Sequence, residues 1–316
     1  MTRNGRTELV VLGDYAWDVL IRTNTQLLQG GDTYGEVMLT PGGSAANVAV
    51  WAARSGLPSR FVGKIGQDRF GQLAVDELAE EEVESYLIQS EAQLTGSVAV
   101  FVDQSGERSM VSGRGADHYL LPSELPRELL ADTRHLHLTA WSFFSDPPRT
   151  AAREAARIAK EAGATLSFDP GSFQMISEMG LEAFLTCTCD LGIDLLLPNH
   201  EEGSELTGEQ DTEAIAFGLA KLYPGALIVL KLDAQGSLVL ENGRIDYVPP
   251  ATDRLVDATG AGDSYAGAFL ARFLRGCTAL DAARFATRVS AWTIQKLGAR
   301  PKPDSALETV LADSPG

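Results

Sequence analysis

The sequence predicts an α/β fold with a doubly wound, mostly parallel sheet and helices on both of its faces. Short apolar runs alternate with stretches of helical periodicity along most of the 316 residues, which is the pattern of a parallel sheet with crossover helices. Residues 17–40 and 96–117 lack helical periodicity. These two stretches predict a second, small sheet that projects from the main one.

The expected elements follow in chain order. The first is a buried strand over 8–13, then a helix of small residues over 44–55, a strand over 61–65 and an amphipathic helix over 68–82. Later strands are expected at 135–139, 165–169, 193–197, 226–232 and 237–241, with helices at 147–163, 200–207 and 211–222. Another helix begins near Ala261, and the end of the chain, 303–316, is expected to be frayed.

Composition excludes several classes of protein. With 43 acidic and 26 basic side chains the net charge is −17, which disfavours nucleic-acid binding because that requires clustered Lys and Arg. No apolar run approaches the ~20 residues of a membrane span, and the first residues do not form a signal peptide. The three cysteines (Cys187, Cys189 and Cys277) lack C-x-x-C spacing. We therefore expect a reduced, cytoplasmic protein that binds neither nucleic acid nor membranes.

The strongest local signal is the string DATGAGDS at 257–264, which leads into a helix. Free amides and the dipole at a helix N-terminus favour an anion, and Gly260 and Gly262 let a phosphate approach the backbone. A carboxylate at Asp263 suits a base or a cation ligand, although a capping Asp beside glycines needed for close packing is the simpler alternative. The chain has no Walker P-loop, and Tyr265 stands where a dinucleotide fingerprint has its third glycine.

A second string, PGGSAAN at 41–47, opens the first small-residue helix. Gly42 and Gly43 allow a ligand to approach the backbone, and the amide of Asn47 offers both a donor and an acceptor. The alternative is a turn into a helix that packs closely on the sheet.

A third string, NHEE at 199–202, follows an expected strand at the edge where open α/β sheets bind ligands. The carboxylate of Glu202 is suited to holding Mg²⁺ through water. An ordinary acidic first turn of a helix is the alternative.

Together, these strings resemble the ribokinase-like (PfkB-type) carbohydrate kinase family, and the resemblance spans residues 8–302. It implies ATP-dependent phosphorylation of a hydroxymethyl group of a small sugar by in-line transfer. Asp263 would be the base that removes the proton of the sugar hydroxyl. Gly260, Ala261 and Gly262 would form the anion hole for the transferring phosphoryl group.

The resemblance also assigns binding residues. The sugar would be held by Asp18, Gly42, Gly43 and Asn47. ATP and Mg²⁺ would be held by Asn199, Glu202 and the turn from Lys231 to Gly236. Asp233 departs from the glycine common in that turn. Asp257 and Thr259 would lie beside a site for a monovalent cation such as K⁺.

Arg114 lies in the stretch expected to form the small sheet, and two interpretations of it stay open. Its guanidinium suits an anionic part of a substrate, and a purely solubilising role is the alternative. His135 and His137 alternate on an expected strand, where hydrogen-bonded core histidines are favoured over metal ligands because no third ligand is evident.

The family resemblance implies that the two stretches without helical periodicity form a β-sheet lid. The α/β core with the ATP site would then comprise 1–16, 41–95 and 118–316, and the lid over the sugar site would comprise 17–40 and 96–117, with a turn at 103–106. Apolar residues alternate in 17–22 and 97–102, which predicts an apolar lid face.

That apolar face predicts a homodimer through the lid, in which a charge at Val100 or Phe101 would weaken both assembly and sugar affinity. The alternative is a monomer whose lid folds onto its own core.

Other functions remain open on the sequence alone. Within the family they are a 2-keto-3-deoxygluconate-type kinase and a nucleoside kinase. Outside it they are a dinucleotide-binding oxidoreductase, which the missing third glycine disfavours, and a non-catalytic sugar- or nucleotide-binding relative, which Asp263 disfavours. The sequence does not name the acceptor, because a few side chains decide it.

Overall fold

The computed structural model describes residues 7–102 and 108–312. Its middle layer is a nine-stranded sheet in the order β13-β12-β11-β10-β9-β8-β1-β4-β5. Neighbouring strands from β11 to β5 are parallel, whereas β12 and β13 pair antiparallel at one edge. The strands are β1 Leu9–Leu12, β4 Ser59–Gly66, β5 Glu84–Ser90, β8 His135–Thr139, β9 Thr165–Asp169, β10 Leu195–Leu196, β11 Leu227–Lys231, β12 Ser237–Glu241 and β13 Arg244–Val248.

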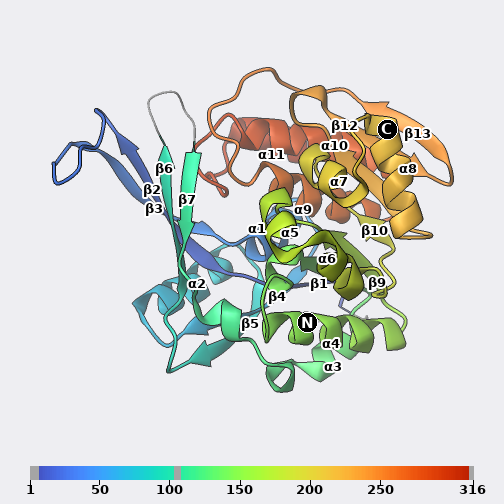
Figure 1. Ribbon diagram of the computed structural model, residues 1–316, viewed down its shortest axis with the longest axis horizontal. Helices are drawn as coiled ribbons and strands as arrows, with labels where there is room; N and C mark the ends of the chain where they lie inside the picture. Colours follow the sequence, from blue (N-terminus) through green and yellow to red (C-terminus); the bar gives the residue numbers. More distant parts are fainter. Residues whose placement is uncertain (1–6, 103–107, 313–316) are drawn as a thin grey trace.

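Helices cover both faces of this sheet, with α10 and α11 above it and α3 and α4 below it in Figure 1. The α-helices are α1 Ser44–Arg54, α2 Arg69–Glu80, α3 Arg127–Ala131, α4 Pro148–Glu161, α5 Phe173–Met179, α6 Leu181–Thr188, α7 His200–Thr207, α8 Thr212–Leu222, α9 Ala261–Phe273, α10 Ala279–Thr293 and α11 Ser305–Ala312. Short 3₁₀ turns lie at η1 Ala116–Tyr119, η2 Pro122–Glu124, η3 Ala140–Ser142 and η4 Asp233–Gln235.

Strand β1 shows why the sheet has two cores. Its four residues are fully buried, and alternate side chains enter opposite clusters because successive side chains of a strand point to opposite faces. Leu9 and Val11 pack with helices α1, α9 and α10, whereas Val10 and Leu12 pack with α3, α4 and α8. A continuous apolar run therefore marks a strand covered on both sides.

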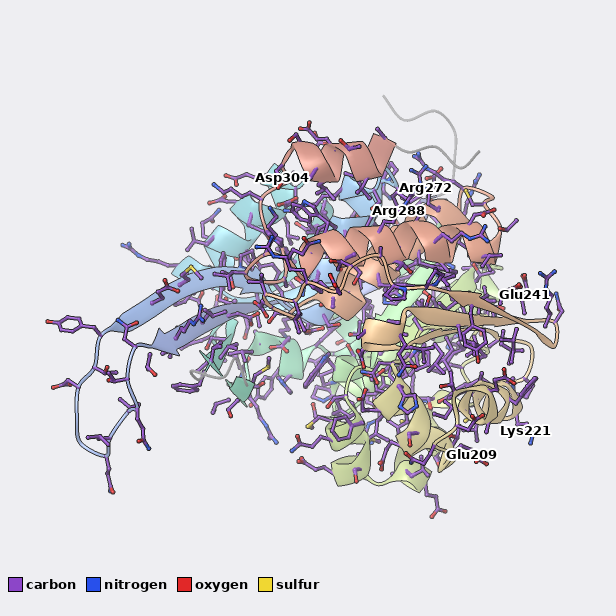
Figure 2. All side chains as sticks on the ribbon, turned by 90° about the horizontal axis from the view of Figure 1, so that it is seen from above. Glu209, Lys221, Glu241, Arg272, Arg288 and Asp304 are labelled. Carbon is purple, nitrogen blue, oxygen red and sulfur yellow. The ribbon has the colours of Figure 1, made fainter. Side chains whose placement is uncertain are left out.

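The second sheet has four strands in the order β3-β2-β6-β7 and lies apart from the central sheet. Its strands are β2 Ala16–Thr23, β3 Gly35–Gly42, β6 Gly96–Val102 and β7 Arg108–Ser112. The outer pairs are antiparallel and the central pair is parallel. Figures 1 and 2 both show β2 and β3 extending away from the main body.

The predicted fold class is thus confirmed, and each expected strand and helix corresponds to an observed one within a few residues. The predicted turn at 103–106 lies outside the described residues. That the larger unit holds ATP and that the small sheet is a lid over the sugar site stay predictions.

The prediction that 303–316 is frayed was wrong for most of this segment, because α11 forms there. Asp304, labelled in Figure 2, explains the helix: its Oδ1 accepts hydrogen bonds from the backbone N of Leu307 at 3.0 Å and from Nε1 of Trp292 at 2.8 Å. The first bond caps α11, and the second ties it to α10. Leu307 is fully buried, so α11 adds to the core.

Candidate active site

The N-termini of α1 and α9 meet at the carboxylate of Asp263. This residue is the third of α9, and its Oδ1 accepts a hydrogen bond from Oγ of Ser44 at 2.7 Å. Its Oδ2 accepts another from Nδ2 of Asn47, also at 2.7 Å. Both donors lie in the first turns of α1, so the glycine-rich strings at 41–47 and 257–264 form one site.

Burial raises the pKa of Asp263 to about 6, and the hydrogen bonds from Asn47 and Ser44 oppose this rise. The neighbouring charge of Asp169 raises the pKa further, and that of Lys231 lowers it. A carboxyl with a pKa of about 6 is ionised at neutral pH, and it is also a stronger base than an ordinary aspartate.

Gly260 is required at the start of α9 for two reasons. Its φ of 73° lies in the left-handed region, and a Cβ there would be 2.7 Å from the Cα of Ala299. The amide of Ala261 donates to the carbonyl O of Ala258 at 3.2 Å, so it is the amides that follow it in the first turn of α9, those of Gly262 and Asp263, that can face an anion. The turn at residues 260–262, the anion-site turn, is therefore a candidate anion site.

Lys231 and Asp169 form a largely buried ion pair beside this turn, with 2.7 Å between Nζ and Oδ2 and side chains 11% and 7% exposed. A Cβ at Gly262 would lie 3.1 Å from the Nζ of Lys231, so the ammonium group borders the glycine turn. The charge of Asp169 is the main factor that raises the pKa of Lys231 against the effect of burial. The lysine therefore stays protonated, as a group that neutralises phosphate must.

Asn199 and Glu202 form a capping box at the start of α7. Oδ1 of Asn199 accepts from the backbone N of Glu202 at 2.8 Å, and Oε2 of Glu202 accepts from the backbone N of Asn199 at 2.8 Å. Burial, and next the charge of Asp169, raise the pKa of Glu202 to about 8. Asn199 and Glu202 thus begin α7, and both also line a cavity.

A cavity of about 470 Å³ joins these groups. From the predicted nucleotide and catalytic residues it is lined by Asn199, Glu202, Lys231, Gly236, Gly260, Ala261, Gly262 and Asp263. Gly236 has a φ of 93°, and a Cβ there would lie 2.0 Å from the carbonyl O of Val248. Asp233, where a glycine is common, has a φ of 49° and so adopts a left-handed conformation that Asp tolerates.

The predicted sugar residues are not among those that line this cavity, and Asn47, whose backbone N donates to the carbonyl O of Gly43, connects them to Asp263. Gly42 faces Asp18, since a Cβ at Gly42 would be 2.6 Å from Oδ2 of that carboxylate. Gly43 has a φ of 86°, and a Cβ there would be 2.6 Å from the carbonyl O of Asp14. Burial raises the pKa of Asp18 to about 7, Arg300 opposes the rise, and Asp14 and Asp263 add to it. These charges place Asp18 in the same acidic surroundings as the base.

Comparison with known proteins assigns this arrangement to a family. The model of the pfkB family carbohydrate kinases matches residues 6–306. The chain belongs to the pfkB family of carbohydrate kinases. A fructokinase from Escherichia coli is 32% identical over 268 residues, which cover 82% of this carbohydrate kinase and 82% of the relative.

Solved structures agree with the fold of this carbohydrate kinase. A putative ribokinase II from E. coli, in complex with ATP and Mg²⁺, has a TM-score of 0.83 at 25% identity, with 96% of this chain and 99% of that chain covered. An adenosine kinase from Sinorhizobium meliloti has a TM-score of 0.86 at 22% identity, with 98% and 100% covered. At this identity, the similarity to the adenosine kinase shows a shared fold and nothing about the substrate.

Two further sets of predicted residues of the kinase, Arg114 and the pair Asp257 and Thr259, stay predictions. Arg114 is exposed and is not among the residues that line the cavity. The carboxylate of Asp257 accepts hydrogen bonds from N and Oγ1 of Thr259 at 2.9 and 2.7 Å, and from N of Gly298 at 2.9 Å. Asp257 therefore holds the start of the DATGAGDS string against residue 298.

Across residues 7–102 and 108–312, no group of three or more His, Cys, Asp or Glu side chains could hold a metal ion. Asp169, Asn199 and Glu202 are among the residues that line the cavity, and their side-chain oxygens suit Mg²⁺ held largely by phosphates and water. No helix of the described part of the kinase is long and apolar enough to cross a membrane.

Three residues of the site were not predicted from the sequence: Ser44, Asp169 and Arg300. Ser44 lies inside the PGGSAAN string, where its partner was not evident. Asp169 ends an expected strand, and the carboxyl ends of parallel strands are where ligands bind, so its position was a usable signal. Arg300 lies in an irregular segment and has no local signal in the sequence.

Proposed function

We propose that this carbohydrate kinase transfers the γ-phosphoryl group of ATP in line to a hydroxymethyl group of a small sugar, with Asp263 as the base. One observation carries the proposal. The Asp263 carboxylate, fixed at 2.7 Å by both Ser44 and Asn47, borders the cavity with the anion-site turn, and Asn47 also contacts Gly43 of the predicted sugar residues.

In this reaction the sugar hydroxyl gives its proton to an oxygen of Asp263 while its own oxygen bonds to the γ-phosphorus. The bond from that phosphorus to the β–γ bridging oxygen breaks, and ADP leaves. The amides of residues 260–262 and the ammonium of Lys231 face the charge on the transferring group. Positioning and charge stabilisation are what phosphoryl transfer requires most.

The nucleotide would enter as its Mg²⁺ complex, as in the E. coli ribokinase II solved with ATP and Mg²⁺. Glu202, Asn199 and Asp169 would hold the ion, mainly through water, and the ion would neutralise phosphate charge. A monovalent cation such as K⁺ beside Asp257 and Thr259 is part of the same proposal.

Fructose is the first acceptor to test, because the E. coli relative named fructokinase is 32% identical. A 2-keto-3-deoxygluconate-type acid and adenosine are the alternatives within the family. The small sheet would cover the bound sugar and exclude water, which would limit hydrolysis of ATP.

The decisive experiment compares Asp263→Asn with Asp281→Asn. Asp281 occupies the third position of α10, as Asp263 does in α9, and has no part in the site. We expect Asp263→Asn to bind ATP as the parent does and to lose about 10²- to 10⁴-fold in kcat, the usual contribution of a general base. Asp281→Asn should keep the parental kcat.

Turnover would be followed as ADP formation with fructose, ribose, 2-keto-3-deoxygluconate and adenosine, and ATP binding by calorimetry. A kcat of Asp263→Asn within a few-fold of the parent would show that Asp263 is not the base. Binding of sugar and ATP by the parent, without ADP formation on any acceptor, would favour a non-catalytic relative.

A further inference from the structure

Arg300 is a buried cation at the centre of the site, and its side chain is 1% exposed. Its Nε donates to Oδ1 of Asn47 at 2.6 Å, its Nη2 to the carbonyl O of Gly42 at 2.9 Å and its Nη1 to Oε2 of Glu77 at 2.6 Å. The guanidinium also lies 5.4 Å from the ring centroid of Tyr15. A buried charge is costly even when paired, so its presence beside the catalytic residues calls for a reason.

The hydrogen bond to Asn47 has a consequence for the base. A guanidinium group can only donate, so the atom of Asn47 that faces it must be the carbonyl Oδ1. The amide is planar, and its Nδ2 then points to the opposite side, where it donates to Oδ2 of Asp263 at 2.7 Å. Arg300 thus determines which end of the amide faces the carboxylate.

We propose that Arg300 is a positioning residue for phosphoryl transfer: it locks the amide of Asn47 so that Nδ2 donates to Asp263, and it holds the Gly42 carbonyl in the same set of hydrogen bonds. The inference rests on the proposed role of Asp263 as the base. It assigns a function to the segment around residue 300, which the glycine-rich strings do not include.

Loss of Arg300 would free the Asn47 amide to rotate. Of the groups that lower the pKa of Asp263, the Asn47 hydrogen bond is the largest, ahead of the hydrogen bond from Ser44 and the charge of Lys231, while Asp169 acts in the opposite direction. Without the hydrogen bond from Arg300 that orients Asn47, the pKa of Asp263 should rise, so Asp263 should keep its proton to higher pH. The charge of Arg300 directly lowers the pKa of Asp18 as well. The test must therefore distinguish a pKa change at Asp263 from one at Asp18.

The chain offers a matched control in Arg54. Its side chain is also buried, at 7% exposure, and it pairs with Glu81 and lies 4.9 Å from the ring centroid of Trp51. Its Nη1 donates to the carbonyl O of Pro301, next to Arg300, but the hydrogen bonds of Arg54 do not involve Asn47. Arg54→Met therefore removes another buried guanidinium from the same region without removing a hydrogen bond to Asn47 or Asp263.

The experiment measures kcat and kcat/KM from pH 5 to 9 for Arg300→Met, Arg54→Met and the parent. We expect Arg300→Met to lose about 10- to 100-fold in kcat, as for a broken hydrogen bond to a charged group, with the KM for ATP within about twofold. The acid limb of its kcat profile should move up by about one pH unit. Arg54→Met should melt at a lower temperature and keep the parental pH profile.

Arg300→Lys keeps a positive charge opposite Glu77, so it provides a folded variant where Arg300→Met does not fold. One ammonium group cannot bridge three acceptors, so the same shift of the acid limb is expected. The shift should persist when Arg300→Lys is combined with Asp18→Asn, because it arises at Asp263.

An acid limb unchanged in the Arg300 variants, or moved equally in Arg54→Met, would overturn the inference and leave only a structural role. Disappearance of the shift in the Asp18→Asn background would overturn it as well. Failure of the proposed function gives a different result, since Asp263→Asn would then remain active.

Discussion

Glu202 belongs to both the framework of α7 and the nucleotide cavity. Its two carboxylate oxygens accept from N and Nδ2 of Asn199 at 2.8 and 3.1 Å, and its side chain is buried. A capping interaction alone does not require burial beside Asp169 and Lys231, the two charges with the largest effects on the pKa of Glu202. The position therefore favours a role in cation binding in addition to helix capping.

We expect Glu202→Gln to raise the Mg²⁺ concentration for half-maximal rate by roughly tenfold, the usual effect of losing an indirect metal ligand. Glu209→Gln, just beyond the C-terminal end of α7 and exposed, is the control, because its charge is not among those that act on Glu202. Because the pKa of Glu202 is raised to about 8, its carboxylate forms as pH rises through 8, so the parental Mg²⁺ requirement should fall between pH 7 and 9. Identical Mg²⁺ titrations for Glu202→Gln and the parent would leave the residue with its capping role alone.

The same titrations extend to monovalent cations. Asp257 accepts hydrogen bonds from Gly298 and Thr259, and these bonds set the path of the chain into the anion-site turn. A cation beside Asp257 would stabilise that turn, so we expect faster turnover in K⁺ than in tetramethylammonium at equal ionic strength. Equal rates in K⁺, Na⁺ and tetramethylammonium would contradict the cation site.

At the scale of elements, the two glycine turns and the strands were predictable because their signals are local. Gly43 and Gly260 need positive φ values, and a short string of glycines before a helical pattern reveals such positions. The contacts across the site were not predictable, because Ser44 lies 219 residues from Asp263 and Asn47 lies 253 residues from Arg300. Such pairs depend on how whole elements pack, and spacing along the chain does not contain that information.

Strands β8 and β9 share a buried polar layer. Nε2 of His135 and Nδ1 of His137 each lie 2.7 Å from Oγ of Ser167, and Nδ1 of His135 lies 2.7 Å from Oγ1 of Thr165. Each histidine is thus hydrogen-bonded to a hydroxyl group of the neighbouring strand, the alternative favoured over metal binding, although Nε2 of His137 is buried without a hydrogen-bond partner among the described residues. Burial lowers the pKa of each to about 3, so both are neutral in the folded protein.

These depressed pKa values predict a loss of stability in acid. Between pH 6.5 and 3 the unfolded chain binds protons at His135 and His137 while the folded chain does not, so their contribution is complete above pH 6.5 and falls as pH decreases. Each costs up to about 1.4 kcal/mol per pH unit in that range. Urea unfolding at pH 7 and at pH 5 gives the drop in the free energy of unfolding between the two pH values. This drop should be smaller for His137→Gln than for the parent. For His200→Gln, a less buried control, it should equal that of the parent. Parallel losses in all three proteins would contradict the assignment.

At the scale of the whole molecule, the small sheet has two unlike faces. Leu20 and Val100 are adjacent on the face that carries Asp18, and both are buried, at 3% and 1% exposure. Of the two positions predicted to tolerate no charge, Val100 is therefore buried on this inner face, and Phe101 lies on the other face, at 37% exposure. The opposite face carries at least partly exposed apolar side chains on all four strands, among them Ile21, Val37, Leu39, Phe101 and Val111.

This outer apolar face makes a homodimer through the lid a testable prediction. Val37 is 68% exposed and Val111 is 65% exposed, and a four-stranded sheet with one such face gains stability by covering it. A net charge of −17 opposes association, so the measurement belongs at moderate salt, where that repulsion is screened. Covering the outer face with a second lid would also steady the Asp18 face, which links assembly to sugar binding.

We expect light scattering at micromolar concentration to give a mass of about 68 kDa, twice the 33.8 kDa of one chain. Val111→Asp should lower the mass towards that of one chain and raise the KM for the sugar by about tenfold, while the KM for ATP stays the same, because a charge in an apolar interface is costly. Phe217→Asp on α8, which places a charge at an exposed apolar residue outside the lid, should change neither quantity. A parental mass near 34 kDa with full activity would show that each lid closes over its own core without a partner.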